Sequence, residues 1–246
     1  STTQGTTSTG ANDPLDIIGA MLERMPRSKR PWLHVDAAWS GVAAVCPEHR
    51  GMLTGIERAD SLCINPHKWL LTNFDCDLFW VRDREALTSS MSITPAYLHN
   101  DQSDAGSVVD YRDWHVPLGR KMRSLKLWFV LRYFGAQGLR DHIGHHVGLA
   151  QRFERYVLGE SRLRMAFERS LSLVCFVVEG ESDRTRMLIE RINARRKVMI
   201  SHTQVPVDGE ASRWVARVAI GSSGVRDEDI TTLIDEINAV LDEVVQ

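Results

Sequence analysis

The sequence lacks long apolar runs and an excess of either charge, and each absence excludes a class of protein. Charged residues interrupt every hydrophobic stretch before it reaches the roughly 18 residues of a membrane span, so no membrane segment is predicted. Lysine and arginine number 30 against 32 aspartates and glutamates, without the basic excess that binds nucleic acid. We therefore expect neither a membrane nor a nucleic acid as a partner.

The chain also has little cysteine and no recognisable secretory signal. Its 4 cysteines show no C-x-x-C spacing, which argues against a cysteine-ligated metal or a structural disulfide. Scattered cysteines are typical of reduced thiols in the cytoplasm. The N-terminal segment carries neither the basic stretch nor the apolar stretch of a signal peptide. The expected location is therefore cytoplasmic.

What is present is an ordinary globular composition, with 43% hydrophobic and 25% charged residues. The first third of the chain alternates short apolar runs with helical patterns, which is typical of an α/β sheet covered by helices. We predict a helix over 14–25 and strands over 32–36, 60–65 and 77–82. Residues 89–114 are polar and aperiodic, which predicts a long loop with a function.

The rest of the chain shows first a helical pattern and then a mixed one. Helices are predicted over 119–137 and 138–158, with Gly135 and Gly138 at the break between them. A small α+β domain should follow, and alternation in its last strand indicates a sheet covered on one face. Its predicted elements are strands over 171–178, 198–205 and 214–220, and helices over 183–196 and 227–245.

We place the domain boundary inside the helical connector. This division gives part of a large domain over 1–140 and a small C-terminal domain over 141–246. Each part is of ordinary domain size.

Two residues at predicted strand ends suggest a specific chemistry. Lys68 lies in the segment NPHKW directly after one strand, and Asp36 ends the strand before it. Taken alone, Lys68 is an ordinary surface lysine and Asp36 an ordinary helix cap. Together they are the parts of a pyridoxal phosphate site, because the amine forms a Schiff base and the carboxylate keeps the pyridine nitrogen protonated.

Further segments in the same order resemble the group II pyridoxal-phosphate-dependent decarboxylases, most closely the aromatic-L-amino-acid decarboxylases. The resemblance covers about residues 1–178 and is weaker from there to the end. It implies an α/β fold of type I, with a mixed and mostly parallel sheet in the large domain and a small α+β C-terminal domain. The matching segments are 5–10, 34–38, 59–61, 65–71, 73–76, 110–114 and 117–129.

The resemblance implies roles for three residues near the predicted strand ends. Lys68 matches the Schiff-base lysine, and Asp36 matches the partner of the pyridine nitrogen. His67 matches the residue beside the lysine–cofactor bond. Pyridoxal phosphate is the implied cofactor.

Five other matches are less specific. Asn65 resembles a residue that contacts the cofactor phosphate, or it shapes a turn. Thr7 and Ala38 resemble residues that line the cofactor, although Thr7 could instead cap a strand. Tyr97 resembles the loop tyrosine that delivers a proton after carbon dioxide leaves, or is an exposed aromatic residue. Relatives that make aldehydes have phenylalanine there. Gly119 resembles a position that leaves room for an aromatic substrate, or starts a helix.

The implied function is decarboxylation of an aromatic L-amino acid to the arylalkylamine and carbon dioxide, by a homodimer. The alternatives are an aromatic aldehyde synthase, a glutamate- or sulfinoalanine-type decarboxylase, and a silent remnant. Full-length family members are about twice as long as this chain. We therefore expect a fragment that lacks the N-terminal half and is poorly stable alone.

Three histidines at helical spacing raise the question of a metal site. His142, His145 and His146 share one side of the predicted helix. No carboxylate or cysteine completes an obvious ligand set. We predict a solvated helix face and no metal.

Overall fold

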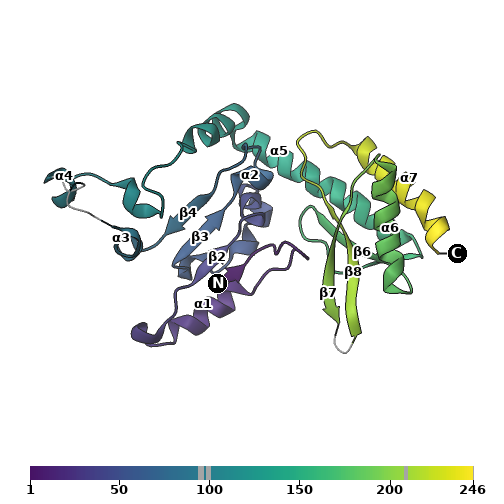
Figure 1. Cartoon of the computed structure of the whole chain (residues 1–246), viewed down its shortest axis with the longest axis horizontal. Helices are drawn as coiled ribbons and strands as arrows, with labels where there is room; N and C mark the ends of the chain where they lie inside the picture. The colour runs from purple at the N-terminus through teal and green to yellow at the C-terminus, as the bar shows by residue number, and fades with distance from the viewer. Residues whose placement is uncertain (94–96, 98–100, 208–209, 246) are drawn as a thin grey trace.

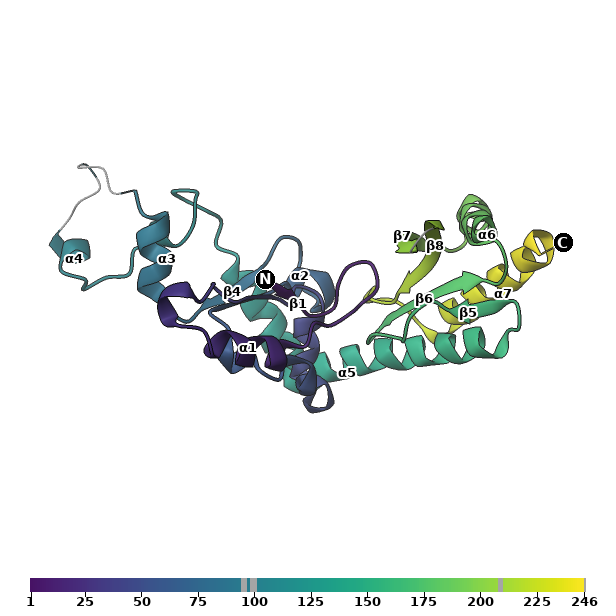
Figure 2. The same ribbon diagram turned by 90° about the horizontal axis from the view of Figure 1, so that it is seen from below.

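The computed structural model describes the chain except for residues 94–96, 98–100, 208–209 and 246. The described residues form two units, each built on a four-stranded sheet, and one long helix runs along both (Figures 1 and 2). None of the helices in the described part of the chain is long and apolar enough to cross a membrane.

The first sheet is mixed and mostly parallel, as predicted. Its strands lie in chain order, with the first three parallel and the fourth antiparallel to the third. In this register Asp36 lies opposite Cys63. The strands are β1 (Thr2–Thr3), β2 (His34–Asp36), β3 (Ser61–Ile64) and β4 (Leu78–Val81).

One face of this sheet forms a small core beneath α1 (Leu15–Glu23). Leu15 of the helix packs with Val35 of β2, which is completely buried. Alternation along β2 places His34 and Asp36 on the other face. The polar residues that end the strands are therefore held against a rigid apolar layer.

Short helices connect the strands. Asp83 caps α3, because its carboxylate accepts hydrogen bonds from the amides of Glu85 and Ala86. The segment predicted as a long loop begins within α3 and includes two short helical turns. The connecting elements are η1 (Arg27–Lys29), η2 (Ser40–Val45), η3 (Pro47–Leu53), η4 (Ile56–Arg58), α2 (Pro66–Trp69), α3 (Arg84–Met91), α4 (Asp101–Asp104) and η6 (Tyr111–Trp114).

Helix α5 (Ser124–Gly159) joins the two units, and the proposed boundary at residue 140 lies within it. Gly135 breaks the helix with φ 62° and ψ 178°, so the predicted interruption is present. A positive φ is easy for glycine because it has no Cβ. Figure 2 shows the second part of α5 running beneath the C-terminal unit.

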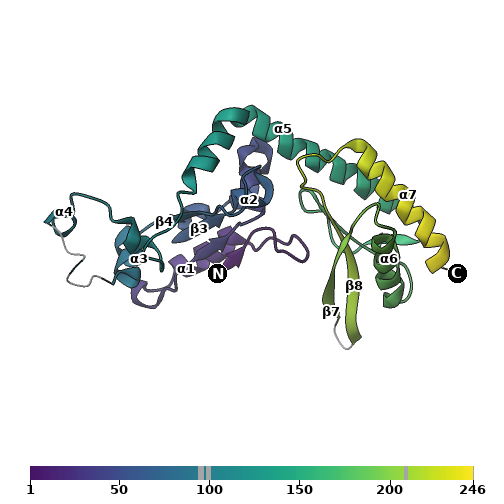
Figure 3. The ribbon, with the colours of Figure 1, turned by 45° about the horizontal axis from the view of Figure 1, so that its top comes forward.

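The second unit is an antiparallel sheet in the order β5-β6-β8-β7, with helices on one face (Figure 3). The other face was predicted to be uncovered, and this was wrong. Val215 on that face is buried in a cluster with Leu173, Cys175 and Val177, and this cluster is covered by Phe167 and by Trp39 of the first unit. The elements are β5 (Leu163–Met165), β6 (Leu173–Val178), α6 (Ser182–Arg195), β7 (Ser201–Val207), β8 (Glu210–Ala219) and α7 (Asp227–Val244).

Candidate functional site

The candidate site is built where two neighbouring parallel strands end. Asp36 is the last residue of β2, and Asn65 directly follows β3. Parallel strands present their carboxyl ends at the same edge of a sheet, where ligands bind in open α/β folds. The Asn65 amide donates a hydrogen bond of 2.9 Å to the carbonyl oxygen of Ala38. Three predicted cofactor-binding residues are therefore adjacent.

The Asp36 carboxylate has one oxygen occupied and one available. Its Oδ1 accepts a hydrogen bond of 2.9 Å from the Ala38 amide, and the Cys63 thiol lies 3.6 Å from the same oxygen. Within the described residues, Oδ2 has no hydrogen bond to the protein. An available carboxylate oxygen at a strand end fits the protonated ring nitrogen of pyridoxal phosphate.

Lys68 is carried by α2, which begins directly after the end of β3. Pro66 at the first helical position has a backbone angle suited to a helix start. The Lys68 amide then donates to the Asn65 carbonyl oxygen at 3.0 Å. The lysine side chain is exposed and lines a cavity of about 330 Å³ that lies between the two units. The lining residues are Gly5, Thr6, Thr7, Trp39, Lys68, Trp69, Ser172, Leu173, Arg217, Ala219, Ile220 and Gly221.

Arg217 of β8 joins Thr7 and Lys68 in this cavity, and the sequence analysis did not identify it. Its Nε donates to the Ser8 carbonyl oxygen at 3.0 Å, and its Nη2 also contacts the Thr7 carbonyl oxygen. Two cations in one cavity favour an anionic ligand. The only signal in the sequence was a charged residue on a strand face.

His67 faces a different cavity from its neighbour Lys68. Its Nδ1 lies 2.7 Å from the carbonyl oxygen and 3.0 Å from the amide nitrogen of Cys76. Its ring meets the Phe74 ring edge-on, with the two ring centroids 4.9 Å apart. The role predicted for His67 beside the cofactor stays a prediction. The cavity measures about 380 Å³ and is lined by His67, Phe74, Asp75, Cys76, Asp77, His115, Pro117, Arg120 and Arg123.

Asp77, just before β4, is a second acidic group that the sequence analysis missed. Burial raises the pKa of its carboxyl group, and the charge of Asp36 raises it further. The positive charges of His67, His34 and Lys68 act in the opposite direction. Asp77 therefore lies within electrostatic range of the predicted cofactor groups, as its position at the same sheet edge could have suggested.

The structure does not bring Tyr97 or Gly119 to the Lys68 cavity. Tyr97 lies between α3 and α4 with 81% of its surface exposed. Gly119 is also exposed, and no other atom would lie within 4 Å of a Cβ at this position. Their roles in proton delivery and substrate fit stay predictions.

The histidine group on α5 is not simply a solvated face, and that prediction was wrong for His146. His146 is buried. Its Nδ1 accepts a hydrogen bond of 2.8 Å from Trp69 Nε1, and its Nε2 lies 3.1 Å from the Ser222 carbonyl oxygen. Burial, together with the neighbouring His142 and His145, lowers the pKa of His146 to about 4. A neutral His146 therefore links the lysine helix to the second unit. No group of three metal-binding side chains occurs within the described residues.

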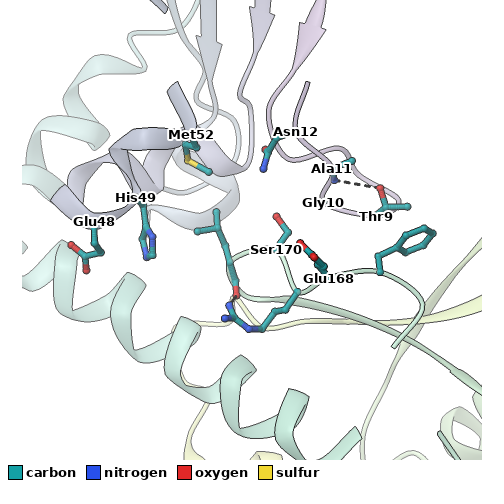
Figure 4. Close-up of a pocket in the computed structure, with 12 residues that line it drawn as sticks. Thr9, Gly10, Ala11, Asn12, Glu48, His49, Met52, Glu168 and Ser170 are labelled. Atoms are coloured by element: carbon teal, nitrogen blue, oxygen red, sulfur yellow. Dashed lines mark hydrogen bonds between the residues drawn. The ribbon is translucent and has the colours of Figure 1, made fainter. Parts of the chain in front are cut away.

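A larger cavity of about 520 Å³ lies away from Lys68 and Asp36 (Figure 4). It is bounded by the 9–12 loop, η3 and residues 167–171. Figure 4 shows His49 and Glu48 on one side of it and Ser170 and Glu168 on the other. Its lining includes none of the residues predicted to bind the cofactor, whereas Lys68 and Thr7 line the smaller cavity, which is therefore the better candidate.

Comparison with known proteins identifies the family. The family model described as the pyridoxal-dependent decarboxylase conserved domain matches residues 1–179. Tryptophan decarboxylase 2 of Oryza sativa subsp. japonica is 41% identical over 99% of this chain and 49% of its own length. Phenylacetaldehyde synthase of Arabidopsis thaliana is 43% identical over 89% of this chain and 44% of its own length. The chain belongs to the pyridoxal-dependent decarboxylase family.

Solved structures agree with this assignment and with the predicted fold class. The structure of Catharanthus roseus tryptophan decarboxylase in complex with L-tryptophan matches with a TM-score of 0.88 and 38% identity, over 99% of this chain and 50% of that chain. Oryza sativa TDC with PLP and tryptamine matches with a TM-score of 0.92. The chain thus spans about half the length of the relatives it matches.

Proposed function

We propose that this chain is part of a pyridoxal-phosphate-dependent enzyme that decarboxylates an aromatic L-amino acid to the arylalkylamine and carbon dioxide. The observation that carries the proposal is the pairing of Asp36 and Lys68 at the ends of adjacent parallel strands, in a chain of this family. The relatives named as tryptophan and tyrosine decarboxylases support the substrate class.

Each residue of the site would have a distinct task. Lys68 would hold the cofactor covalently, and the available oxygen of Asp36 would hold a proton on the ring nitrogen. Arg217 would offer donors to anionic groups in the Lys68 cavity, and Thr7 would border the ring. Asn65, directly after β3, would offer a further donor to an anionic group. When bound, pyridoxal phosphate supplies an electron sink for the bond to the carboxylate.

Borohydride reduction followed by intact-mass and peptide analysis of the natively produced protein tests this proposal. We expect a phosphopyridoxyl adduct on Lys68, and amine release from an aromatic amino acid. Lys68→Ala should abolish both, whereas Lys29→Ala, at an exposed lysine on η1, should abolish neither. Continued amine release by Lys68→Ala would refute the site. Absence of any adduct would favour the silent remnant.

An aromatic aldehyde synthase is the second candidate, because phenylacetaldehyde synthase of Arabidopsis thaliana is 43% identical to this chain. Tyr97 favours the decarboxylase, because a phenol can donate the proton that completes amine formation. Tyr97→Phe should therefore lower the amine yield and raise the aldehyde yield. Product analysis distinguishes the two, and an unchanged ratio would remove Tyr97 from the mechanism.

The finer features of the proposal are the substrate fit, the assembly and the location. Gly119 would leave room for a bulky aromatic side chain, and Gly119→Ser should weaken the preference for it. A homodimer in the cytoplasm would be the working form. Light scattering of the natively produced protein tests the assembly.

A further inference from the structure

We infer that Cys63 is a positioning residue, which holds the Asp36 carboxylate so that one of its oxygens remains available to the cofactor. The inference rests on the function proposed above. It adds a residue from the neighbouring strand, and the contact of this residue with Asp36 does not depend on the cofactor.

The pairing of β2 and β3 produces this contact. Asp36 and Cys63 are direct partners in the parallel register, and their side chains meet on the same face of the sheet. The Cys63 Sγ lies 3.6 Å from Asp36 Oδ1, within the range of a thiol hydrogen bond. A neighbouring pair on the same face, His34 and Ser61, also meets, with Nδ1 2.8 Å from Oγ.

Two donors on one oxygen fix the orientation of the carboxylate. The Ala38 amide approaches Oδ1 from the loop that follows β2, and the Cys63 thiol approaches from β3. A single donor would leave the carboxylate free to turn about its last torsion, which is broad. With both donors present, Oδ2 is the oxygen that faces a ligand.

The thiol can donate only while it is protonated, and its surroundings keep it so. Burial, the negative charges of Asp36 and Asp77, and the hydrogen bond to Asp36 together raise the pKa of Cys63 to about 11, against a smaller lowering by the Ala37 backbone. At neutral pH Cys63 is therefore a neutral donor and not a nucleophile. A thiol is a weak donor, so it orients Asp36 while leaving the carboxylate basic.

The first test measures the contact without the cofactor. In the full-length natural protein depleted of cofactor, the rate of Cys63 alkylation by iodoacetamide is followed against pH by peptide mass. Asp36→Asn removes the negative charge that faces the thiol and leaves only a neutral amide oxygen as acceptor, so alkylation at about pH 9 should rise fivefold or more as the pKa of Cys63 falls. Asp77→Asn should raise it less, because Asp77 acts on Cys63 through its charge alone. Cys46, buried in another core cluster, serves as the internal reference.

The second test measures the consequence for the cofactor. Cys63→Ala should raise the dissociation constant for pyridoxal phosphate severalfold. It should also shift the pH dependence of the visible absorbance of the bound cofactor. Cys63→Ser keeps a donor on the same Cβ and should restore most of both. Cys46→Ala is the matched control and should change neither.

The outcomes separate this inference from the proposed function. An unchanged alkylation profile in Asp36→Asn overturns the inference even if Lys68 carries the cofactor. Equal behaviour of Cys63→Ala and Cys63→Ser also overturns it, because a structural role would not depend on a donor. Absence of an adduct on Lys68 refutes the proposed function, while the alkylation result still reports on the Cys63–Asp36 contact.

Discussion

The two units of the chain differ in how completely they bury their own apolar residues. In the second unit all six residues of β6 are buried, and three helices close a continuous core over one face of the sheet. In the first unit, the α5 residues Trp128 and Phe129 are 53% and 58% exposed, and Phe79 on β4 is 48% exposed. The second unit therefore completes a core within this chain, and the first does not.

This difference concerns the surroundings of the candidate site. Large exposed apolar patches mark surfaces that contact other polypeptide. The matched relatives are about twice as long as this chain, and we expect their additional length to correspond to the cover over the first unit. The Lys68 cavity is lined by residues of both units, so its shape should depend on how well the first unit is covered.

A matched pair of substitutions provides the strongest test of this comparison. Phe153→Ala in the second unit empties a completely buried position and should lower the free energy of unfolding by about 3–5 kcal/mol. Phe79→Ala removes the same side chain from a half-exposed strand and should cost less than about 1 kcal/mol. Urea unfolding followed by circular dichroism measures both. Equal losses would show that the first unit is covered in solution.

The junction between the units should give an intermediate effect. His146→Ala leaves the buried indole N–H of Trp69 without its acceptor and should cost about 1–3 kcal/mol. His145→Ala, at an exposed neighbour, is the control and should cost less than about 0.5 kcal/mol. A loss no larger than that of His145→Ala would mean that the hydrogen bond does not couple the units.

The same residue makes the junction sensitive to acid. The folded-state pKa of His146 is about 4, below the ordinary histidine pKa of 6.5, so the unfolded chain binds the proton first. The contribution of His146 to stability is complete above about pH 6.5 and falls as the pH drops towards about 4. His146→Ala should flatten that part of the stability profile. His142 faces the same ring and also has a lowered pKa, so some slope should remain.

Local patterns predicted most of the fold, because strand and helix periodicity follow directly from which side chains face a core. The strand ending at Asp36 and the helix interruption at Gly135 could both be predicted in this way. The second covered face of the C-terminal sheet could not. Its cover includes Trp39, which is far from β8 in the sequence.

The site shows the same limit. Asp36 and Lys68 were predicted because Asp36 ends a strand, Lys68 closely follows the next strand, and together they resemble a known motif. Cys63 and Arg217 were missed because their contacts depend on strand register and on how the two units meet. His146 was misassigned because helical spacing alone does not show which face of a helix is covered.

The smallest effect should come from two partly exposed ion pairs, one in each unit. Asp75 contacts Arg123, 48 residues away, whereas Glu160 contacts Arg162, only two residues away. Both carboxyl groups have a pKa lowered to about 2, chiefly by the hydrogen bond from arginine. Each contribution is therefore complete above the ordinary carboxyl pKa and is lost as the pH falls towards about 2.

These pairs differ in what they do in the unfolded chain. A contact between residues two apart persists in part after unfolding, while a contact across 48 residues does not. Asp75→Asn should therefore lower the urea midpoint slightly more than Glu160→Gln, and both differences should shrink in high salt because exposed charges are screened. The reverse order would mean that the first unit is too loosely folded for Asp75 to hold α5 in place.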